Sequence, residues 1–429
     1  MLNIHILDIN FFEENKMETG RLRIHIFKGY TSIPIGDAKI IVLQNKEASN
    51  KQTIYNMFSD SSGIASNIEL EAPPLEYSLK PSAKQPYSLC KIIVEVPGYK
   101  KLTISGCQIY PGITSIQHCY LNPTSPRQSD EDNINISPNT LFGNFEPKIA
   151  ENPMPTHNIS ELGESFAIPF AEQKIPRSII VHDGHPNNKN ASNFKVYYKE
   201  YLKNVMSSEI YPTWPIESLK ANAYAIISFT LNRVFTEWYW AKGKKFHVTS
   251  STATDHKYTP GISFSSVIEG IINELFSTYI KKANYSFPLL SQYTDGIKVP
   301  HRSGWMTQWG SKKLADDGKT AFEILKFYYG SEISIFKTEK IGDISESYPG
   351  YSLQIGTKGE PVKNIQTYLN AIAKVYSLIP KVNVDGNFGN DTKKAVETFQ
   401  IIFSLTKTGI VDYSTWYKIS DIFVALSKG

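Results

Sequence analysis

The chain has 429 residues, a length that favours about three domains over a single core. Hydrophobic residues make up 41% of it, with 25 Tyr, 22 Phe and 6 Trp, so folded cores can form. The 45 Lys and Arg nearly balance the 41 Asp and Glu, and no long basic run occurs. This balance argues against a nucleic-acid-binding protein, whereas the aromatic excess suits stacking on sugars.

The N-terminus, MLNIHILDINFFEENK, has no basic stretch before its apolar residues and no small-residue cleavage site, so we recognise no Sec signal peptide. No run of about eighteen apolar residues occurs, which argues against a membrane span. Cys90, Cys107 and Cys119 lack the paired spacing of a zinc site or a disulfide framework. We expect them to be buried as small hydrophobes.

After an N-terminal segment, 1–19, the range 20–123 has the pattern of β-strands. LRIHIF alternates, AKIIVL and CKIIVEV are β-branched runs, and DSSG and VPGYKK supply turns. We predict a small β-sandwich, and its SDSSGIA turn at 59–65 resembles prealbumin-like or carboxypeptidase-regulatory-like modules.

The composition changes over 124–175. The stretches SPRQSDEDNINISPN and EPKIAENPMPTHNISELGES are rich in Pro, Asn, Ser and acidic residues and show no apolar period. We predict a linker, or a segment removed in maturation, and expect protease access to be easiest here.

The range 176–340 is predicted to be an α+β domain. NFKVYYKEYLKNVMSSE has helical periodicity, and Pro212 prevents its continuation, so Glu209 falls in or just past a last helical turn. A second helix is predicted from Pro215 to Gly243. Thr320 and Glu323 form a capping-box pattern ahead of a further helix.

Glu209 is the main catalytic candidate. A carboxylate at a helix C-terminus, shielded by Tyr211 and Trp214, should hold its proton tightly, as a general acid must. Sequence physics alone would favour an ordinary solvated glutamate, because perturbed carboxylates are the minority.

A resemblance favours the catalytic interpretation. YLKNVMSSEIYPTWPIESLKANAYAIISFTLNR resembles the core of the SpoIID/LytB family of peptidoglycan-cleaving lytic transglycosylases, and the blocks at 246–261 and 291–330 resemble later parts of that family. The resemblance covers about 175–340. It implies that Glu209 is the catalytic acid.

The range 341–429 is predicted to be a small three-helix domain, with two similar helices from an internal repeat and a third from TGIVDYSTWYKI. The paired positions are Gly359, Val362, Ile365 and Leu369, matched by Gly389, Thr392, Ala395 and Phe399. VDGNFGNDTKKAVETFQ at 384–400 resembles the peptidoglycan-binding domain type 1. The whole order of domains is similar to clostridial spore cortex-lytic enzymes of the SleC type. That similarity implies a zymogen in the cortex or coat region of the spore, cut by a subtilisin-like germination protease.

Further residues are candidates for binding a glycan. They are Tyr211, Trp214, Ser251, Asp255, Gln292, Trp305, Gln308 and Trp309. The aromatic members would fit a buried core equally well. Glu217, Asp255 and Asp295 are candidates for a second carboxylate, although Glu217 is explained by its place in the first turn of a helix.

A zinc site is not expected. His182, His185, His247 and His256 could be assembled into one, but no HExxH pair occurs. Some relatives have a Cys/His cluster in the block that corresponds to STATDHKYTPG, which here contains only His256. We therefore expect no metal and no cofactor.

The sequence thus predicts a multidomain α+β protein that cleaves the bond between N-acetylmuramic acid and N-acetylglucosamine in spore cortex peptidoglycan, leaving 1,6-anhydromuramoyl ends. An N-acetylmuramoyl-L-alanine amidase and a non-catalytic wall-binding spore protein are the alternatives. The expected partners are peptidoglycan and the activating protease, with neither nucleic acid nor membrane.

Overall fold

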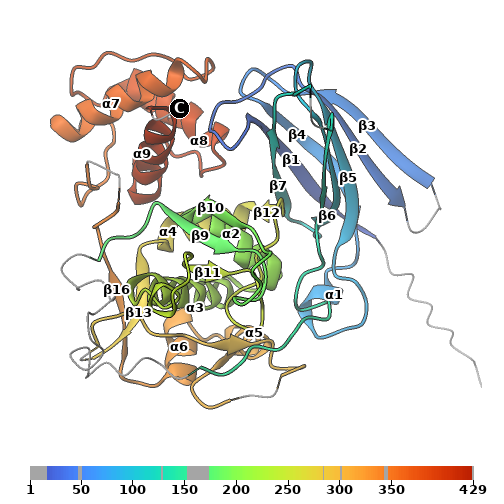
Figure 1. Cartoon of the computed structure of the whole chain (residues 1–429). Coiled ribbons are helices and arrows are strands. Elements are labelled where there is room, and N and C mark those ends of the chain that lie inside the picture. The colour runs from blue at the N-terminus through green and yellow to red at the C-terminus, as the bar shows by residue number, and fades with distance from the viewer. Residues whose placement is uncertain are drawn as a thin grey trace, which may run out of the picture.

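The computed structural model of the chain describes residues 17–46, 51–126, 129–151, 173–283, 285–299, 302–342 and 346–427. Within these ranges the protein is a mixture of α and β structure in several units, as the sequence predicts (Figure 1). A strand-rich unit lies beside a central unit built around helices, and a helical unit lies above the central one (Figure 1).

The N-terminal unit consists of two sheets that enclose one core. The first has the order β12-β7-β1-β4 and the second the order β3-β2-β5-β6-β8. Their elements are β1 (Glu18–Lys28), β2 (Lys39–Lys46), β3 (Lys51–Phe58), β4 (Ile64–Ala72), β5 (Ser88–Glu95), β6 (Lys101–Ile109), β7 (Thr114–Leu121), β8 (Glu131–Asn135) and β12 (Phe264–Ser265). A short helix, α1 (Glu76–Leu79), follows β4. The core includes Leu22, Ile40, Ile92 and Ile104, all fully buried, and the three free cysteines lie buried in this unit, as expected.

Two strands of these sheets come from outside 20–123. β8 belongs to the range expected to be a linker, and it pairs in parallel with β6 through the backbone. Ile134 and Ile136 also pack against the core. The expectation of a linker here is therefore wrong for β8, because backbone pairing does not require an apolar period in the sequence. β12 comes from the central unit and pairs with β7, so the two units share a sheet.

The central unit is arranged around a long helix, α3 (Ile216–Phe235), which contacts α2, α4, α5 and α6. The other helices are α2 (Tyr198–Glu209), α4 (Ser266–Leu275), α5 (Gln308–Asp316) and α6 (Ala321–Tyr329). A three-stranded sheet has the order β10-β9-β11. Two further pairs of strands are β13-β16 and β14-β15. The strands of the central unit are β9 (Ser178–His182), β10 (Asn193–Tyr197), β11 (Val248–Thr249), β13 (Thr278–Lys282), β14 (Tyr293–Thr294), β15 (Met306–Thr307) and β16 (Ile333–Lys337).

The boundaries of the helices follow local signals, with one exception. Pro215 is the N-cap of α3, and the capping box of Thr320 and Glu323 is formed in α6. α3 ends at Phe235, however, and not at Gly243. Glu237 has a φ of 48°, which breaks the helix, and a separate 3₁₀ turn, Trp240–Lys242, follows. Gly243 ends that turn in the left-handed conformation.

The C-terminal unit contains α7 (Glu360–Ala373), α8 (Asn390–Ile402) and α9 (Tyr413–Ser427). The sequence repeat predicts the first two, and the stretch TGIVDYSTWYKI predicts the third. The unit is joined to the rest of the molecule by polar contacts. Lys418 lies 3.4 Å from Glu269 of α4, and Arg23 of β1 donates to the carbonyl groups of Ile401 and Ile402. No helix in the described ranges is both long and apolar enough to cross a membrane.

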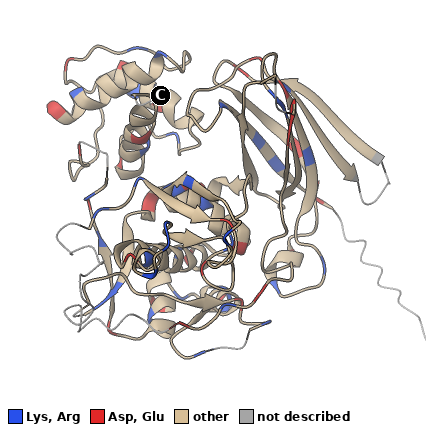
Figure 2. Cartoon of the chain, viewed as in Figure 1, with Lys and Arg blue, Asp and Glu red and all other residues tan. Residues whose placement is uncertain are grey.

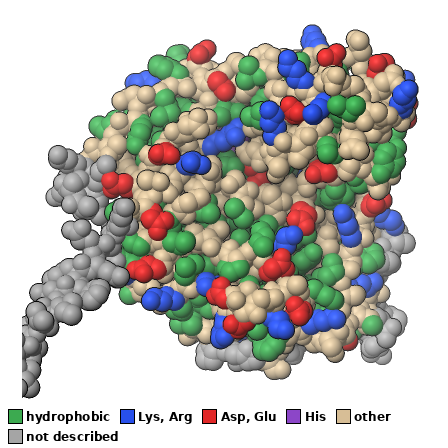
Figure 3. Space-filling view, turned by 180° about the vertical axis from the view of Figure 1, so that it is seen from behind, with side chains coloured by type: hydrophobic (Ala, Val, Ile, Leu, Met, Phe, Trp, Pro, Cys, Tyr) green, Lys and Arg blue, Asp and Glu red, His purple; other side chains and the backbone are tan. Residues whose placement is uncertain are grey.

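Charged side chains of both signs are scattered over all three units (Figure 2). The reverse face likewise mixes acidic, basic and apolar groups (Figure 3). A group of ionisable side chains is buried where the N-terminal and central units meet. Lys203 Nζ lies 2.6 Å from Glu200 Oε1 and 3.4 Å from Glu269 Oε1. His118 of β7 lies 3.8 Å from Glu200 and packs edge-on against Phe264 of β12.

Acidic pH should destabilise the contact between the N-terminal and central units. Burial lowers the pKa of His118 to about 4 and that of His25, which packs beside it, well below its ordinary value. Both are neutral in the folded protein but bind protons in the unfolded chain below pH of about 6.5. Their contribution to stability is therefore complete above that pH and is lost as the pH falls towards 4.

We expect the midpoint of thermal unfolding to fall between pH 7 and pH 5, and to fall less in His118→Asn. The exposed His185 gives the matched control, because His185→Asn should keep the parent's pH dependence. Equal pH dependence in all three proteins would contradict a role for His118.

Candidate active site

Glu209 is the last residue of α2, as the sequence predicts, and its side chain points into the protein. Only 4% of the residue is exposed. The Ile210 backbone N–H still bonds to the Met206 carbonyl, but Ile210 is extended, with φ of −129° and ψ of 148°. The chain then turns at Pro212. The helix end and this turn thus fix the carboxylate in position.

Two donors hold the Glu209 carboxylate. The Lys257 backbone N–H donates to Oε1 at 2.6 Å, and the Tyr293 hydroxyl donates to Oε2. Burial raises the pKa of Glu209, while the Lys148 ammonium, the Tyr293 hydroxyl and the Lys257 N–H oppose that rise. The net shift is upward, so the proton is held more tightly than on a solvated glutamate.

Tyr293 is itself supported by an aromatic stack. Its ring stacks on His256 with centroids 5.7 Å apart and an interplanar angle of 15°. His256 Nδ1 lies 3.1 Å from the Tyr201 hydroxyl. Burial lowers the pKa of His256 well below its ordinary value, so this imidazole is neutral. Its place is behind Tyr293, where it orients the hydroxyl that reaches Glu209.

A pocket of about 80 Å³ opens beside Glu209. The central unit contributes Glu209, Thr252, Tyr293, Thr294, Asp295, Lys298, Val299 and Gln308 to its walls. The remaining wall comes from Thr140, Phe145, Glu146, Pro147 and Lys148. These five residues belong to the range expected to be a linker. That range therefore reaches the candidate active site.

We call residues 139–151 the strap. At its start, the Asn139 amide donates to the Ser207 and Ile210 carbonyls, at 3.1 and 3.2 Å, on either side of Glu209. Further along, the Ile149 N–H donates to the Ala253 carbonyl at 2.8 Å. The strap is thus bound along its length to the segments that form the pocket.

Gln292 binds the far end of the strap. Its side-chain oxygen accepts from the Glu151 backbone N–H at 3.0 Å, and its amide donates to the Glu151 carbonyl at 2.8 Å. Gln292 is one of the predicted glycan-binding residues. Here both of its polar atoms pair with the strap's backbone.

Lys148 of the strap is the cation beside Glu209. Its ammonium lies 4.5 Å from the centre of the Tyr293 ring and 4.6 Å from that of Phe229. Its Nζ is buried and has no hydrogen-bond acceptor in the part of the chain that the structure describes. Burial lowers the pKa of Lys148 to about 8, with Glu209 opposing the shift. The ammonium is therefore held by rings and charge alone.

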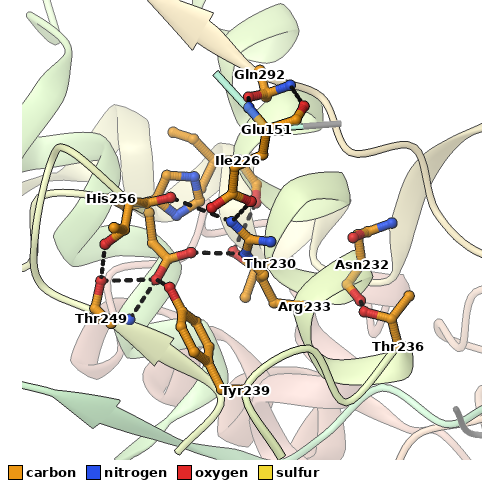
Figure 4. A network of polar contacts seen from close by, with 12 residues as sticks. Glu151, Ile226, Thr230, Asn232, Arg233, Thr236, Tyr239, Thr249, His256 and Gln292 are labelled. Atoms are coloured by element: carbon orange, nitrogen blue, oxygen red, sulfur yellow. Dashed lines mark hydrogen bonds and ion pairs between the residues drawn. The ribbon is translucent and has the colours of Figure 1, made fainter. Parts of the chain in front are cut away.

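A second buried ion group is centred on Arg233 (Figure 4), which shares the Phe229 ring with Lys148. Arg233 Nη2 is 2.5 Å from Glu151 Oε2 of the strap, and Arg233 Nε is 2.8 Å from Asp255 Oδ1. Asp255 also accepts hydrogen bonds from the Tyr239 hydroxyl at 2.7 Å and from the Thr249 N–H at 2.8 Å.

The other predicted polar residues fall into two groups. Gln308 and Asp295 line the pocket, as does Thr252, the neighbour of the predicted Ser251. Asp255 does not line it, because this carboxylate is fully buried in the Arg233 group. Glu217 accepts a bond from the Ala321 N–H at 2.6 Å, which gives it a structural partner at the start of α6.

None of the predicted aromatic residues, all of which lie in the described ranges, lines the pocket beside Glu209. Trp214 packs against Trp309 and Tyr211. Its Nε1 donates to the Ser78 carbonyl of the N-terminal unit at 2.8 Å. Trp305 is buried under the Arg302 guanidinium, which lies 4.9 Å from its ring. In this structure, Tyr211 and Trp214 pack where the two units meet.

Three of the four candidate histidines each have a separate local partner. His182 stacks on Phe246 at 4.5 Å, His247 Nδ1 accepts from the Ile180 N–H, and His256 lies behind Tyr293. Among the described residues, no group of three or more His, Cys, Asp or Glu is placed to hold a metal ion.

Sequence reasoning missed Tyr293, Lys257 and Lys148. Tyr293 directly follows Gln292 in the block SQYTDG, so its position beside a predicted residue was a usable signal. Lys257 acts through its backbone, which no side-chain pattern reveals. Lys148 stands in a polar, Pro-rich stretch, and nothing there marks it as buried.

Two family models match parts of the chain. The Stage II sporulation protein family, SpoIID, matches residues 187–266, which include Glu209. A peptidoglycan binding domain family, PG_binding_1, matches residues 358–419 in the C-terminal unit. Together they indicate a sporulation protein that acts on the cell wall and whose C-terminal unit binds peptidoglycan. No curated protein matches the chain.

Solved structures are similar to parts of the chain at low identity. A catechol 1,2-dioxygenase from Acinetobacter radioresistens is 14% identical, with a TM-score of 0.19, over 29% of this chain and 60% of that one. Transthyretin from Sparus aurata is 12% identical, with a TM-score of 0.16, over 24% of this chain and 91% of that one. The chain thus spans 60% of the dioxygenase's length, and these scores carry no conclusion about fold or activity.

The effect of the Lys148 charge on the pKa of Glu209 should be measurable. Lys148→Met keeps an apolar stem between the two rings but removes the cation that favours the ionised carboxylate, so we expect the pKa of Glu209 to rise. The measurement is a ¹³C NMR titration of carboxyl-labelled glutamate, with Glu209→Gln identifying the signal.

Lys298→Met is the matched control. Lys298 lines the same pocket, but its ammonium binds the Thr140 and Gly143 carbonyls. An equal rise in both variants would show that Lys148 has no particular influence on the carboxylate.

Proposed function

We propose that this protein is a lytic transglycosylase of spore cortex peptidoglycan, made as a zymogen, with Glu209 as its acid and base. The observation that carries the proposal is the environment of Glu209. A buried carboxyl group with a raised pKa, held by Tyr293 and Lys257, lines a pocket, and Glu209 itself belongs to the segment that matches the SpoIID family.

The reaction starts with a proton transfer. Glu209 gives its proton to the oxygen between N-acetylmuramic acid C1 and N-acetylglucosamine C4, and the C1–O bond breaks. An oxocarbenium-like centre develops at C1 and the N-acetylglucosamine leaves with a hydroxyl group. A raised pKa supports this step, because Glu209 must be protonated when the substrate arrives.

The second step closes a ring. Glu209, now ionised, takes the proton of the muramoyl C6 hydroxyl, whose oxygen bonds to C1 and gives a 1,6-anhydro end. The nucleophile belongs to the substrate, so its effective concentration is high, and neither water nor a second carboxylate is required. The Tyr293 hydroxyl and the Lys257 N–H stabilise the ionised carboxylate between the two steps.

The strap supports the proposal of latency. It forms one wall of the pocket and brings Lys148 next to Glu209. A glycan could not occupy the space that the strap fills beside Glu209 until the strap moves. We place the activating cut, by a subtilisin-like germination protease, between 124 and 175. The C-terminal unit would hold the enzyme on the cortex.

The amidase and the purely wall-binding alternatives have less support. Among the described residues, the candidate histidines belong to no group of three or more placed to hold a metal ion, so they do not favour an amidase of the zinc type. Wall binding alone would not require a buried carboxyl group with oriented donors. Neither alternative uses the geometry at Glu209.

Replacement of Glu209 tests the catalytic assignment. In the proteolytically activated protein, we expect Glu209→Gln to lower cleavage of cortex fragments by about 100-fold to 10,000-fold, because the isosteric amide cannot transfer the proton. Binding to isolated cortex should be unchanged. Release of soluble fragments and a pull-down with insoluble cortex measure the two properties.

Asp295→Asn is the matched control. Asp295 lines the same pocket but has no obligatory part in the reaction, so this variant should keep most of the activity. An active, folded Glu209→Gln protein would overturn the assignment. An inactive Asp295→Asn protein would point instead to a two-carboxylate mechanism.

Activation is tested by limited proteolysis. We expect the intact chain to cleave cortex slowly and the rate to rise as a subtilisin-like protease cuts within 124–175, because the cut frees one end of the strap. Mass spectrometry of the products locates the cut, and fragment release measures the rate. A cut in this range without any rise in rate would contradict latency.

A further inference from the structure

Arg233 is a buried guanidinium with an incomplete set of permanent partners. Its side chain has no exposed surface. Nε pairs with Asp255, which lies on the central unit and is fully buried as well. Burial alone lowers the pKa of Arg233, but the neighbouring Asp255 and Glu151 carboxylates raise it above its ordinary value. The guanidinium therefore stays charged.

The outer edge of Arg233 faces the strap. Nη2 lies 2.5 Å from Glu151 Oε2 and donates a longer bond, 3.3 Å, to the Thr254 carbonyl. Nη1 is buried and finds no acceptor within the described part of the chain. If the strap leaves, this edge keeps only the weak bond to Thr254. Asp255 still pairs with Nε, but the N–H groups of Nη1 and Nη2 are then available to donate to an anionic ligand.

The strap residue that occupies this site is a carboxylate. Glu151 is the last described residue before 152–172, and its side chain is 20% exposed, so the site can be reached from solvent. Gln292 holds the Glu151 backbone on the same side (Figure 4). The guanidinium edge thus binds the carboxylate of Glu151, and the Gln292 side chain binds the backbone amide groups of the same residue.

One aromatic ring separates the Arg233 guanidinium from Lys148, the cation beside Glu209. The Phe229 ring has the Lys148 ammonium at 4.6 Å and the Arg233 guanidinium at 4.7 Å from its centre. Lys148 in turn lies beside Glu209 and over the Tyr293 ring. A ligand that follows the course of the strap would meet Glu209 first and Arg233 next.

We propose that Arg233, with Gln292, is a carboxylate-binding subsite of the substrate groove, which Glu151 occupies in the latent chain. For the identity of its ligand the proposal rests on the proposed function. Peptidoglycan offers carboxylates of two kinds, the lactyl carboxylate of an unsubstituted muramoyl unit and the carboxylates of the stem peptide. The stem peptide also offers backbone N–H and carbonyl groups of the kind that Gln292 binds at Glu151 of the strap.

The first experiment uses the full-length chain and acetate as the probe. In Glu151→Ala the carboxylate is removed and a small space is left at Arg233. We expect about 100 mM acetate to raise the midpoint of thermal unfolding of this variant, because the ion restores a partner to the guanidinium. Acetamide, which has the same shape without the charge, and chloride at equal ionic strength should not.

The parent chain is the control, since Glu151 already fills the site, and acetate should leave it unchanged. Equal effects of acetate and acetamide on Glu151→Ala, or an equal acetate effect on the parent, would overturn the subsite. This result does not depend on any enzymatic activity.

The second experiment identifies the ligand, using the activated protein and three glycans. One carries stem peptides with free carboxylates, one carries the same peptides amidated, and one has lost its peptides and exposes lactyl carboxylates. We expect Arg233→Lys to raise KM for the first glycan about tenfold, which corresponds to about 1.4 kcal/mol. Its kcat should change little, because Arg233 does not touch the bond that breaks.

The amidated glycan should have the same KM with the parent and with Arg233→Lys. A raised KM on the peptide-free glycan alone would assign the site to the lactyl carboxylate. Equal rises on all three glycans would overturn carboxylate recognition. If the activated protein cleaves none of them, the proposed function fails, while the acetate experiment still decides the subsite.

Discussion

Burial of the Glu209 carboxyl group is the constraint on which the rest of the site depends. A carboxylate with 4% exposure must be either protonated or compensated. The structure compensates it with two hydrogen-bond donors and a cation, yet burial still raises its pKa. The same residue can therefore hold a proton for a substrate and remain stable as an anion after giving it up.

The donors come from distant parts of the chain, and this requirement explains much of the central unit. Tyr293 reaches Glu209 because its ring stacks on His256. The Lys257 N–H reaches it from a loop in which Asp255 accepts bonds from the Thr249 N–H and the Tyr239 hydroxyl. Arg233 stands on α3, the helix around which the unit is arranged. Its guanidinium pairs with both Asp255 and Glu151, so the loop and the strap meet at one buried ion group.

The strap has the same relation to both charged centres. Lys148 lies beside the anionic Glu209, and Glu151 pairs with the cationic Arg233. Each of these two strap charges lies beside a charge of opposite sign in the central unit, and Gln292 binds the strap's backbone at Glu151. The strap is also tied to the N-terminal unit through β8, which directly precedes it. That unit can therefore hold the strap in place without touching Glu209.

Local patterns in the sequence predicted local structure well. The end of α2 at Glu209, the start of α3 after Pro215 and the capping box at Thr320 follow from neighbouring residues. The contacts that complete the site could not be predicted in this way. β12 joins the sheet of β7, and the Gln117 side chain reaches the Gly261 carbonyl 144 positions away. Such pairings leave no periodic signal.

The strap was missed for a related reason. It is held by ion pairs, by backbone bonds and by Leu141 and Phe142, which pack on the core, but its sequence shows no apolar period that would predict these contacts. The predicted glycan-binding aromatics were ambiguous in the sequence, since an aromatic side chain suits a core as well as a groove. Trp214 illustrates this, because its Nε1 is bound to Ser78 of the N-terminal unit.

Analysis of the chain ends made by the activated protein tests the central claim most directly. Purified cortex is digested, and the new ends are identified by mass spectrometry and by labelling of free amino groups. The account predicts 1,6-anhydromuramoyl termini, lighter by one water than ordinary reducing ends, with no new amino groups and no loss of activity in EDTA. New L-alanine amino termini on intact glycan chains would contradict it.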